Sequence, residues 1–210
     1  MAQRKSKRRP GGAATAGGRP DDGEGKLIDA ALALAARQGW RRTRLSEIAA
    51  EAGLALADAH ALHATKLGIL DAFMRRVDRA VLEAAAPAED EKWRDRLFDV
   101  LMRRFDALQP HRPALAAIIR DSVGDPLALF GAFSLLRSMA WMLEAAGLSA
   151  AGWRGRLRTN LLAGLYVSVF QAFLADDSAD LTKTMAALDQ RLRRAESFLG
   201  MAGRGQRDTG

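Results

Sequence analysis

The sequence predicts an all-α protein. Alanine and leucine dominate it, valine and isoleucine are few, and there is one tyrosine, so strand-forming residues are scarce. From Lys26 onward, apolar residues recur at spacings of three and four, the period of an amphipathic helix. Glycines and prolines fall between these periodic segments, where they end or begin helices. The 210 residues, 49% of them apolar, are enough for a sizeable core.

The first expected helix begins at Lys26 and ends at Gly39, which takes the left-handed conformation cheaply. Thr43 is a plausible N-cap for a second helix, which carries Ile48 and Ala49 on its apolar face and ends at Gly53. A third short helix is expected at 55–63. Thr65 is expected to cap a long fourth helix that runs to about residue 86, and Pro87 then breaks the chain. Further helices are expected at about 89–108, 113–122, 126–146, 152–175 and 179–199.

The positive charge is concentrated at the start of the chain. The net charge is +7, and residues 1–20 supply +6, because they hold six basic side chains and no acidic one. Residues 1–23 also contain a glycine-alanine stretch, so we expect a disordered basic tail there, and a second flexible tail at 201–210. The basic residues expected to attract DNA are Arg4, Lys5, Lys7, Arg8 and Arg9.

Composition and motifs exclude several classes of function. The chain has no cysteine, which rules out disulfides, thiolate metal sites and cysteine nucleophiles. No Ser-His-Asp order, nucleophile elbow or metalloprotease motif is present, so we expect no enzyme, no catalytic residue and no cofactor. His60 and His63 have a possible metal spacing, but without a third ligand we predict no metal site.

No targeting or membrane segment is evident. The N-terminus is basic, with no apolar segment behind it, so no signal peptide is expected. The longest apolar stretch, 161–175, contains Ser168 and Gln171 and is shorter than the roughly 20 residues that a bilayer needs. We interpret it as a buried helix at a core or dimer interface, and we expect a cytoplasmic protein without membrane insertion.

A short helix, a glycine turn and a second short helix, packed on a preceding helix, form the helix-turn-helix layout. The run 39–54, GWRRTRLSEIAAEAGL, resembles the start of the DNA-binding domain of TetR-family regulators. Thr65 and Lys66 fall where that family has Ser-Lys at the start of its fourth helix. The resemblance implies a three-helix head at 24–70 and a helical ligand-binding and dimerisation domain at 71–200. The expected contacts to double-stranded DNA are Arg41, Arg42, Thr43, Arg44, His60 and Lys66.

The third helix offers few side chains that read bases. Alanines fill most of it, Asp58 would repel phosphates, and direct readout needs Arg, Lys, Asn, Gln, Ser or Thr. His60 stands where the family has a phosphate-contacting tyrosine, and His63 where it has a core phenylalanine. The basic tail partly compensates, because such an arm enters a minor groove in homeodomains, although it also attracts any polyanion.

In the body, aromatic and methionine side chains either line a ligand cavity or form plain core. These residues are Met102, Phe105, Phe130, Phe133, Met139, Trp141, Met142, Tyr166 and Phe170. In the TetR reading, the last two helices pair with those of a second copy. The apolar face expected to pair consists of Leu161, Leu162, Leu165, Val169, Ala172 and Phe173.

The C-terminal part carries a second resemblance. Leu165-Tyr166, the run DDSADL at 176–181, Thr184 and LDQRL at 188–192 resemble the C-terminal signature of the coenzyme Q biosynthesis accessory family. Those lipid-binding proteins share the TetR fold without acting as repressors. The acidic run also suits capping of the last helix by Asp177 or Ser178.

Two functions are therefore expected. The first is a TetR-type repressor that binds operator DNA as a homodimer and is released by an apolar small molecule. The alternative is a lipid- or isoprenoid-binding accessory protein of ubiquinone biosynthesis with a degenerate head.

Overall fold

The computed structural model describes residues 20–84, 90–122 and 128–201. Every regular element in these ranges is helical, as the composition predicts. The first four helices are α1 (Pro20–Gln38), α2 (Leu45–Glu51), α3 (Leu56–Leu62) and α4 (Lys66–Leu82). The others are α5 (Trp93–Leu108), the 3-10 helix η1 (Gln109–His111), α6 (Arg112–Ser122), α7 (Ala128–Ala145), α8 (Gly152–Leu174) and α9 (Thr182–Met201).

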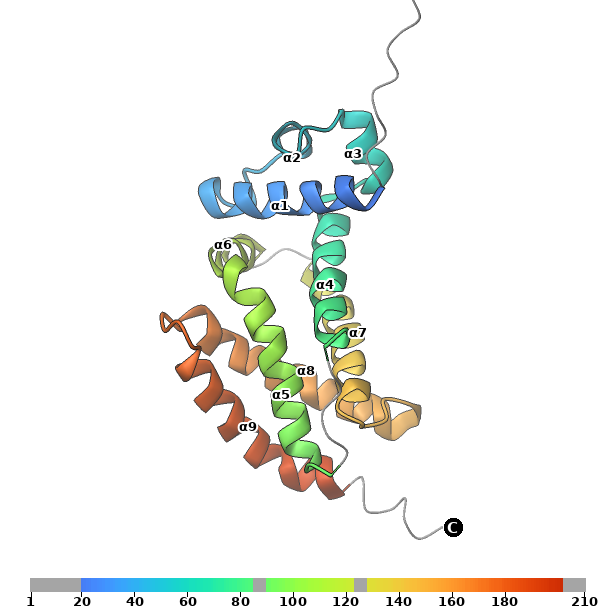
Figure 1. Ribbon diagram of the computed structural model, residues 1–210, viewed down its shortest axis with the longest axis vertical. Helices are drawn as coiled ribbons and strands as arrows, with labels where there is room; N and C mark the ends of the chain where they lie inside the picture. Colours follow the sequence, from blue (N-terminus) through green and yellow to red (C-terminus); the bar gives the residue numbers. More distant parts are fainter. Residues whose placement is uncertain (1–19, 85–89, 123–127, 202–210) are drawn as a thin grey trace, which may run out of the picture.

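The head consists of α1, α2, α3 and the start of α4. Helix α1 lies between α2 and α3 on one side and α6 on the other (Figure 1). Helix α4 leaves the head and packs against α5 and α7, while α8 packs against α7 and α9. Because α4 belongs to both parts, it is a connection through which the body can move the head. The contact between α1 and α6 is another.

Helix α1 begins at Pro20, earlier than the expected start at Lys26, so residues 20–23 belong to a helix and not to the tail. Proline is well suited to a first helical position because its missing N–H would be unpaired there anyway. An ion pair of 2.7 Å between Lys26 Nζ and Asp22 Oδ2, four residues apart, supports this first turn.

Two glycines make the turns of the head. Gly39 and Gly53 have φ angles of +87° and +68°, where a side chain is strained, and they end α1 and follow α2 as the sequence predicts. Thr43 is not the N-cap of α2, which is Arg44. The Thr43 side chain is buried, and its hydroxyl donates to the Gly39 carbonyl oxygen at 2.8 Å. This hydrogen bond stabilises the turn between α1 and α2.

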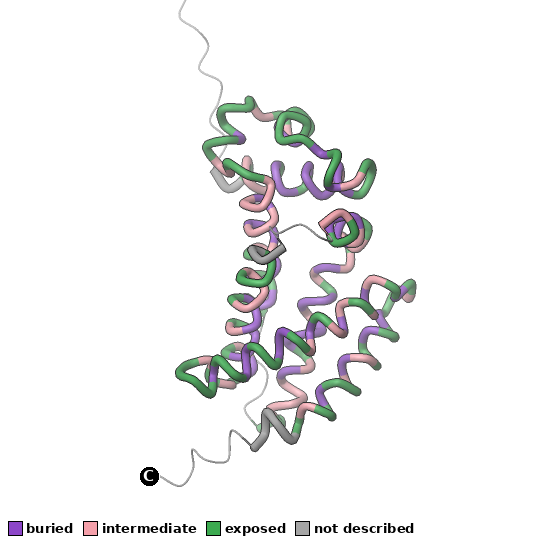
Figure 2. The backbone as a smooth tube through the Cα atoms, turned by 180° about the vertical axis from the view of Figure 1, so that it is seen from behind, coloured by how far each residue is buried: buried purple, intermediate pink, exposed green. Residues whose placement is uncertain are grey.

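The core runs continuously from the head into the body. Buried positions line α1, the middle of α4 and the inner faces of α5, α8 and α9, while exposed positions cover the outside of α2 and α3 (Figure 2). In the body, Phe105 stacks on Tyr166 with ring centroids 4.9 Å apart, and Phe173 lies 5.2 Å away. Among the described helices, α8 alone has the length and composition to cross a membrane, and here it packs between α7 and α9.

The start of α9 is held by a buried carboxylate. Asp176 accepts hydrogen bonds from the Thr184 backbone N–H and hydroxyl, both at 2.7 Å, and from the Ser178 N–H and hydroxyl. Ser178 Oγ in turn accepts from the Thr182 N–H, which confirms the predicted cap at that residue. Burial alone would raise the pKa of Asp176, but these four bonds outweigh it and hold the pKa far below its usual range.

Candidate functional site

Helices α2 and α3 present the head's outer surface. They are joined by the turn at Gly53, whose backbone N–H donates to the Ala50 carbonyl oxygen at 3.1 Å. Ile48 and Ala49 of α2 and Ala59 of α3 are buried beneath this surface. The sequence therefore predicts the helix-turn-helix correctly, because small residues at these contacts let the two helices cross closely.

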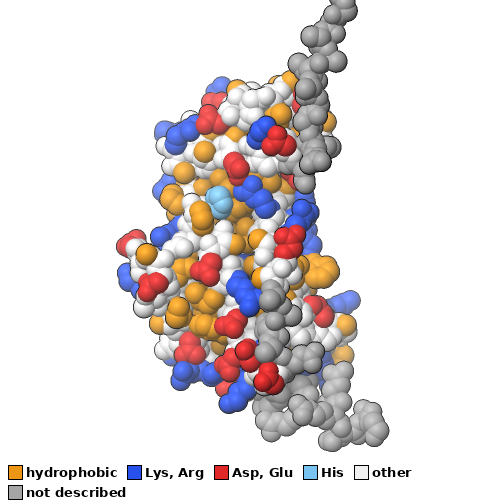
Figure 3. Space-filling model, in the orientation of Figure 1, with side chains coloured by type: hydrophobic (Ala, Val, Ile, Leu, Met, Phe, Trp, Pro, Cys, Tyr) orange, Lys and Arg blue, Asp and Glu red, His pale blue; other side chains and the backbone are white. Residues whose placement is uncertain are grey.

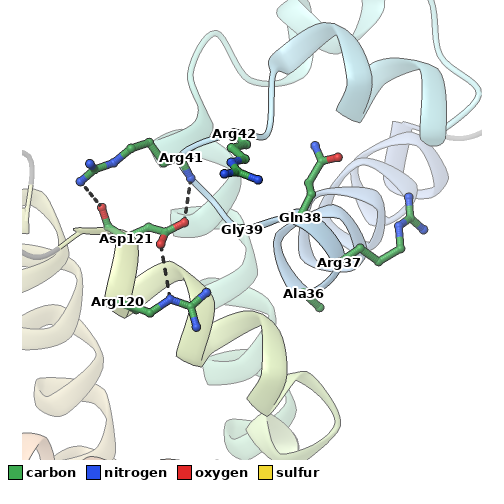
Figure 4. Close-up of a pocket in the computed structure, with 8 residues that line it drawn as sticks. All are labelled: Ala36, Arg37, Gln38, Gly39, Arg41, Arg42, Arg120 and Asp121. Carbon is green, nitrogen blue, oxygen red and sulfur yellow. Dashed lines mark hydrogen bonds and ion pairs between the residues drawn. The ribbon is translucent and has the colours of Figure 1, made fainter.

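The three arginines between α1 and α2 do not point the same way. Arg42 and Arg44 are exposed, beside the start of α2. Arg41 instead turns toward α6, where its Nη2 donates to the Asp121 carbonyl oxygen at 3.1 Å and its backbone N–H donates to Asp121 Oδ2 at 3.0 Å (Figure 4). The expected DNA contact at Arg41 is thus a contact between head and body.

Two more of the predicted DNA contacts are occupied inside the head. Thr43 is only 2% exposed, so the prediction that it contacts DNA is wrong. Lys66 Nζ donates to the carbonyl oxygens of Trp40 and Thr43 at 2.7 and 2.9 Å, and it lies over the Trp40 ring. Burial lowers the pKa of this ammonium, and the negative charge of Asp121 opposes that effect. Lys66 therefore holds the loop that carries the arginines.

The exposed face of α3 is mostly apolar. Leu56 is 57% exposed, Ala57 and Ala61 are exposed, and the polar side chains beside them are Asp58 and His60. His63 turns inward, and its Nε2 lies 2.8 Å from Glu24 Oε1 on α1. His60 and His63 thus have separate surroundings, and no group of three metal-binding side chains occurs among the described residues. The basic tail residues Arg4, Lys5, Lys7, Arg8 and Arg9 lie outside the described ranges.

The body contains a buried polar cluster that the sequence analysis missed. Arg104 of α5 is 1% exposed and forms an ion pair with Asp78 of α4. The Ser138 hydroxyl on α7 donates to Asp78 Oδ2 at 2.6 Å, and Arg104 Nε donates to the Tyr166 hydroxyl on α8 at 3.2 Å. The cluster joins four helices. The sequence pattern could have indicated this cluster, because Arg104 occupies a position of the apolar face of α5, three residues after Leu101 and four after Val100.

The expected ligand-pocket residues divide into three groups. Met102, Phe105, Met139, Met142 and Tyr166 are buried, and Phe170 is half-buried beside them. Phe133 and Trp141 are 71% and 53% exposed, so their assignment to an internal pocket is wrong. They lie eight residues apart on the outer side of α7, because residues at i, i+4 and i+8 share a helix face. The side chain of Phe130 lies outside the described set.

The predicted dimer face also needs correction. Leu162, Val169 and Phe173 are fully buried within the single chain, so they are unavailable to a second copy. Leu161 of the predicted set is exposed, on the outer face of the same helix. Trp153, Leu157 and Val167 are exposed on that face with it, and Met185 is exposed on α9.

Solved structures with the same arrangement exist, although no protein-family model and no curated protein matches the sequence. A TetR transcriptional regulator from Nitrosomonas europaea aligns with a TM-score of 0.69 and 24% identity, over 83% of this chain and 98% of that one. The chain has the TetR fold. A TetR regulator from a Rhodococcus species aligns at 0.59 and 23% identity, over 82% and 96% of the two chains. One from Streptomyces coelicolor aligns at 0.56 and 19%, over 88% and 86%.

At these identities the similarity establishes the fold of the TetR regulators and no more. The division into a head at 24–70 and a ligand-binding and dimerisation domain at 71–200 stays a prediction. The second resemblance, to the coenzyme Q accessory family, is not shown by these structures. The residues behind the second resemblance also have an ordinary structural role, because Asp176, Ser178 and Thr184 form the cap of α9.

Proposed function

We propose that this chain is a cytoplasmic, non-enzymatic transcriptional regulator of the TetR type. In this proposal it is a homodimeric repressor that binds operator DNA and leaves it when an apolar ligand enters the body. The observation that carries the proposal is the head: two short helices joined at Gly53, packed across α1, with Arg42 and Arg44 exposed beside the start of α2. Helix-turn-helix proteins use this surface to contact phosphates and bases.

The contacts differ in kind along this surface. Arg42 and Arg44 are suited to phosphates, which position a protein on DNA without reading its sequence. His60 is the exposed side chain of α3 that can donate to a base or phosphate, while the exposed alanines can meet thymine methyl groups. We therefore expect weak intrinsic sequence readout, supported by the basic tail.

The head is coupled to the body at two places. Helix α4 carries Asp78 into the buried cluster with Arg104, and α6 carries Asp121 to the loop at Arg41. A ligand that separates α4 from α5 and α8 would disturb the first contact and tilt the head. In a dimer this changes the spacing of the two heads, and a fixed operator spacing then no longer fits.

The decisive experiment is recovery of fragmented genomic DNA by the full chain and by a chain lacking residues 1–20, at physiological salt. If both forms enrich one short palindromic site, the head reads sequence and the proposal stands. If only the full chain binds, without site preference, the tail is a polyanion anchor and the regulator function falls. Organic extraction and mass spectrometry then test the alternative, because a lipid-binding accessory protein co-purifies with quinone or isoprenoid.

A further inference from the structure

A cavity of about 550 Å³ lies where the end of α1 meets the end of α6. Its charged lining consists of four arginines and one aspartate: Arg37, Arg41, Arg42, Arg120 and Asp121 (Figure 4). The volume is within the range of small-molecule sites in proteins. The charged lining is more basic than residues 21–210 as a whole, which carry 26 basic and 25 acidic side chains. Positive and negative side chains are otherwise mixed on the face seen in Figure 3.

The acidic groups near the cavity are already engaged. Asp121 accepts from the Arg41 N–H, and its Oδ1 lies 3.6 Å from Arg120 Nε. The hydrogen bond from the Arg41 backbone, together with the charge of Arg120, holds the pKa of Asp121 below its usual value. Glu51 forms an ion pair of 2.9 Å with Arg37. Glu47 accepts a hydrogen bond of 3.0 Å from the side chain of Gln38, another residue of the lining. Four guanidinium charges therefore stand against three carboxylates, which leaves an excess of one positive charge.

The guanidinium of Arg42 is available. Within the part of the chain that the structure describes, no hydrogen bond or ion pair engages it, and its side chain is exposed. The Arg120 side chain is 73% exposed and makes one long contact to its neighbour. Free N–H donors on these two residues approach the cavity from opposite walls, one from the head and one from α6.

From these observations we propose that the cavity binds a small phosphate-bearing molecule. Arg37 and Arg41 are engaged by Glu51 and by the Asp121 carbonyl oxygen, so Arg42, from the loop after α1, and Arg120, from α6, are the guanidinium groups that a ligand would meet. A phosphate offers both of them separate oxygens, whereas a carboxylate has two oxygens in one plane. Arg42 is also among the residues expected to contact DNA, so a DNA phosphate could use it as well. Arg120 distinguishes the two sources of phosphate, because α1 lies between α6 and the outer helices α2 and α3 (Figure 1).

Occupancy of this site would act on the junction between head and body. A phosphate between Arg42 and Arg120 bridges the loop and α6, alongside the Asp121 contacts, and so fixes α6 to the head. This regulation is separate from an apolar ligand in the body, and the binding itself does not depend on whether the head reads DNA.

The test uses the full chain with inorganic phosphate as the probe, at constant ionic strength set with NaCl. Calorimetry and the unfolding temperature are measured together, because a ligand that binds the folded state raises Tm. We expect saturable binding that Arg120→Ala and Arg42→Ala each weaken about tenfold, the loss expected for a charge-assisted contact. Arg79→Ala removes an exposed arginine of α4 that does not line the cavity and is the matched control.

Three results would overturn the proposal. One is the absence of saturable phosphate binding by the full chain. Another is binding that both arginine variants leave unchanged, since the N-terminal tail would then be the anion site. The third is equally tight binding of succinate, a dicarboxylate of similar charge, which would remove the preference for phosphate. Arg120→Ala should leave DNA recovery without added phosphate unchanged, so failure of this site and failure of the regulator proposal give different results.

Discussion

Asp121, near the end of α6, accepts a hydrogen bond from the backbone N–H of Arg41, and its own carbonyl oxygen accepts one from the Arg41 guanidinium. The two residues are 80 positions apart in sequence. Through this pair α6 is attached to the loop that places Arg42 and Arg44 beside α2. The conformation of the body therefore bears directly on the position of the head's exposed arginines.

Asp121→Ala should loosen this loop without unfolding the head. A hydrogen bond to a charged group contributes about 1.5–3 kcal/mol, so exchange of the Arg41 amide hydrogen should become at least about tenfold faster. The measurement is hydrogen exchange resolved at the Arg41 amide. Asp58→Ala, which removes an exposed acid of α3, is the control and should leave this amide unchanged. Equal exchange rates in both variants would show that Asp121 does not hold the loop.

Gly39 and Gly53 allow a comparison of backbone strain with steric contact. Both have positive φ, so alanine at either position should cost about 1–2 kcal/mol of unfolding free energy. A Cβ at Gly39 would also lie 2.9 Å from Asp121 Oδ2, whereas one at Gly53 meets nothing within 4 Å. Urea unfolding should therefore show a larger loss for Gly39→Ala. The extra loss should disappear in the Asp121→Ala background, and its persistence there would contradict the contact.

Much of this head was predictable because its signals are local. Glycine turns and an apolar period of three to four residues identify helices wherever they stand. The direction of each arginine was not predictable, because Arg41 is oriented by Asp121, far away in sequence. The prediction for Phe133 and Trp141 was wrong for a related reason. Where a helix is apolar on most sides, the neighbouring sequence does not show which face of the helix is buried and which is exposed.

The buried pair of Asp78 and Arg104 should be sensitive to loss of one partner. Asp78→Ala leaves a buried guanidinium without its counter-charge, and such changes cost about 3–5 kcal/mol. Ser138→Ala removes one hydrogen bond to the same carboxylate and should cost about 1 kcal/mol. Urea unfolding of both variants gives the comparison. Similar losses in the two variants would mean that the ion pair adds nothing beyond an ordinary hydrogen bond.

Asp176 should make the body acid-sensitive in a defined way. Its folded-state pKa lies far below the unfolded value of about 3.9, so its contribution is complete above that value and is lost as pH falls toward the folded pKa. The slope below about pH 4 should be roughly 1.4 kcal/mol per pH unit. Unfolding of Asp176→Asn, measured against the original chain from pH 7 to pH 3, tests this. The stability difference should be constant at the upper end and shrink below about pH 4, whereas a constant difference throughout would contradict it.

The exposed side of α8 is the face expected to pair with a second copy. Leu157 is 51% exposed and lies one turn from both Trp153 and Leu161 on the outer side of the helix, so these residues form an apolar stripe. Leu157→Glu places a charge in the middle of that stripe, where burial against a symmetry-related copy would be costly. Sedimentation analysis should therefore show a shift from dimer to monomer.

The matched control for the dimer is Leu82→Glu on α4, since Leu82 is 41% exposed and belongs to neither α8 nor α9. It should leave the dimer intact. If Leu157→Glu also remains dimeric, α8 is not the interface. The exposed aromatic side of α7, with Phe133 and Trp141, then becomes the next surface to change, because it is the other described helix face with two large apolar side chains more than half exposed. If only a change on α7 abolishes the dimer, the two copies pair through α7. The two heads would then lie at a different separation, and the operator half-sites would have a different spacing.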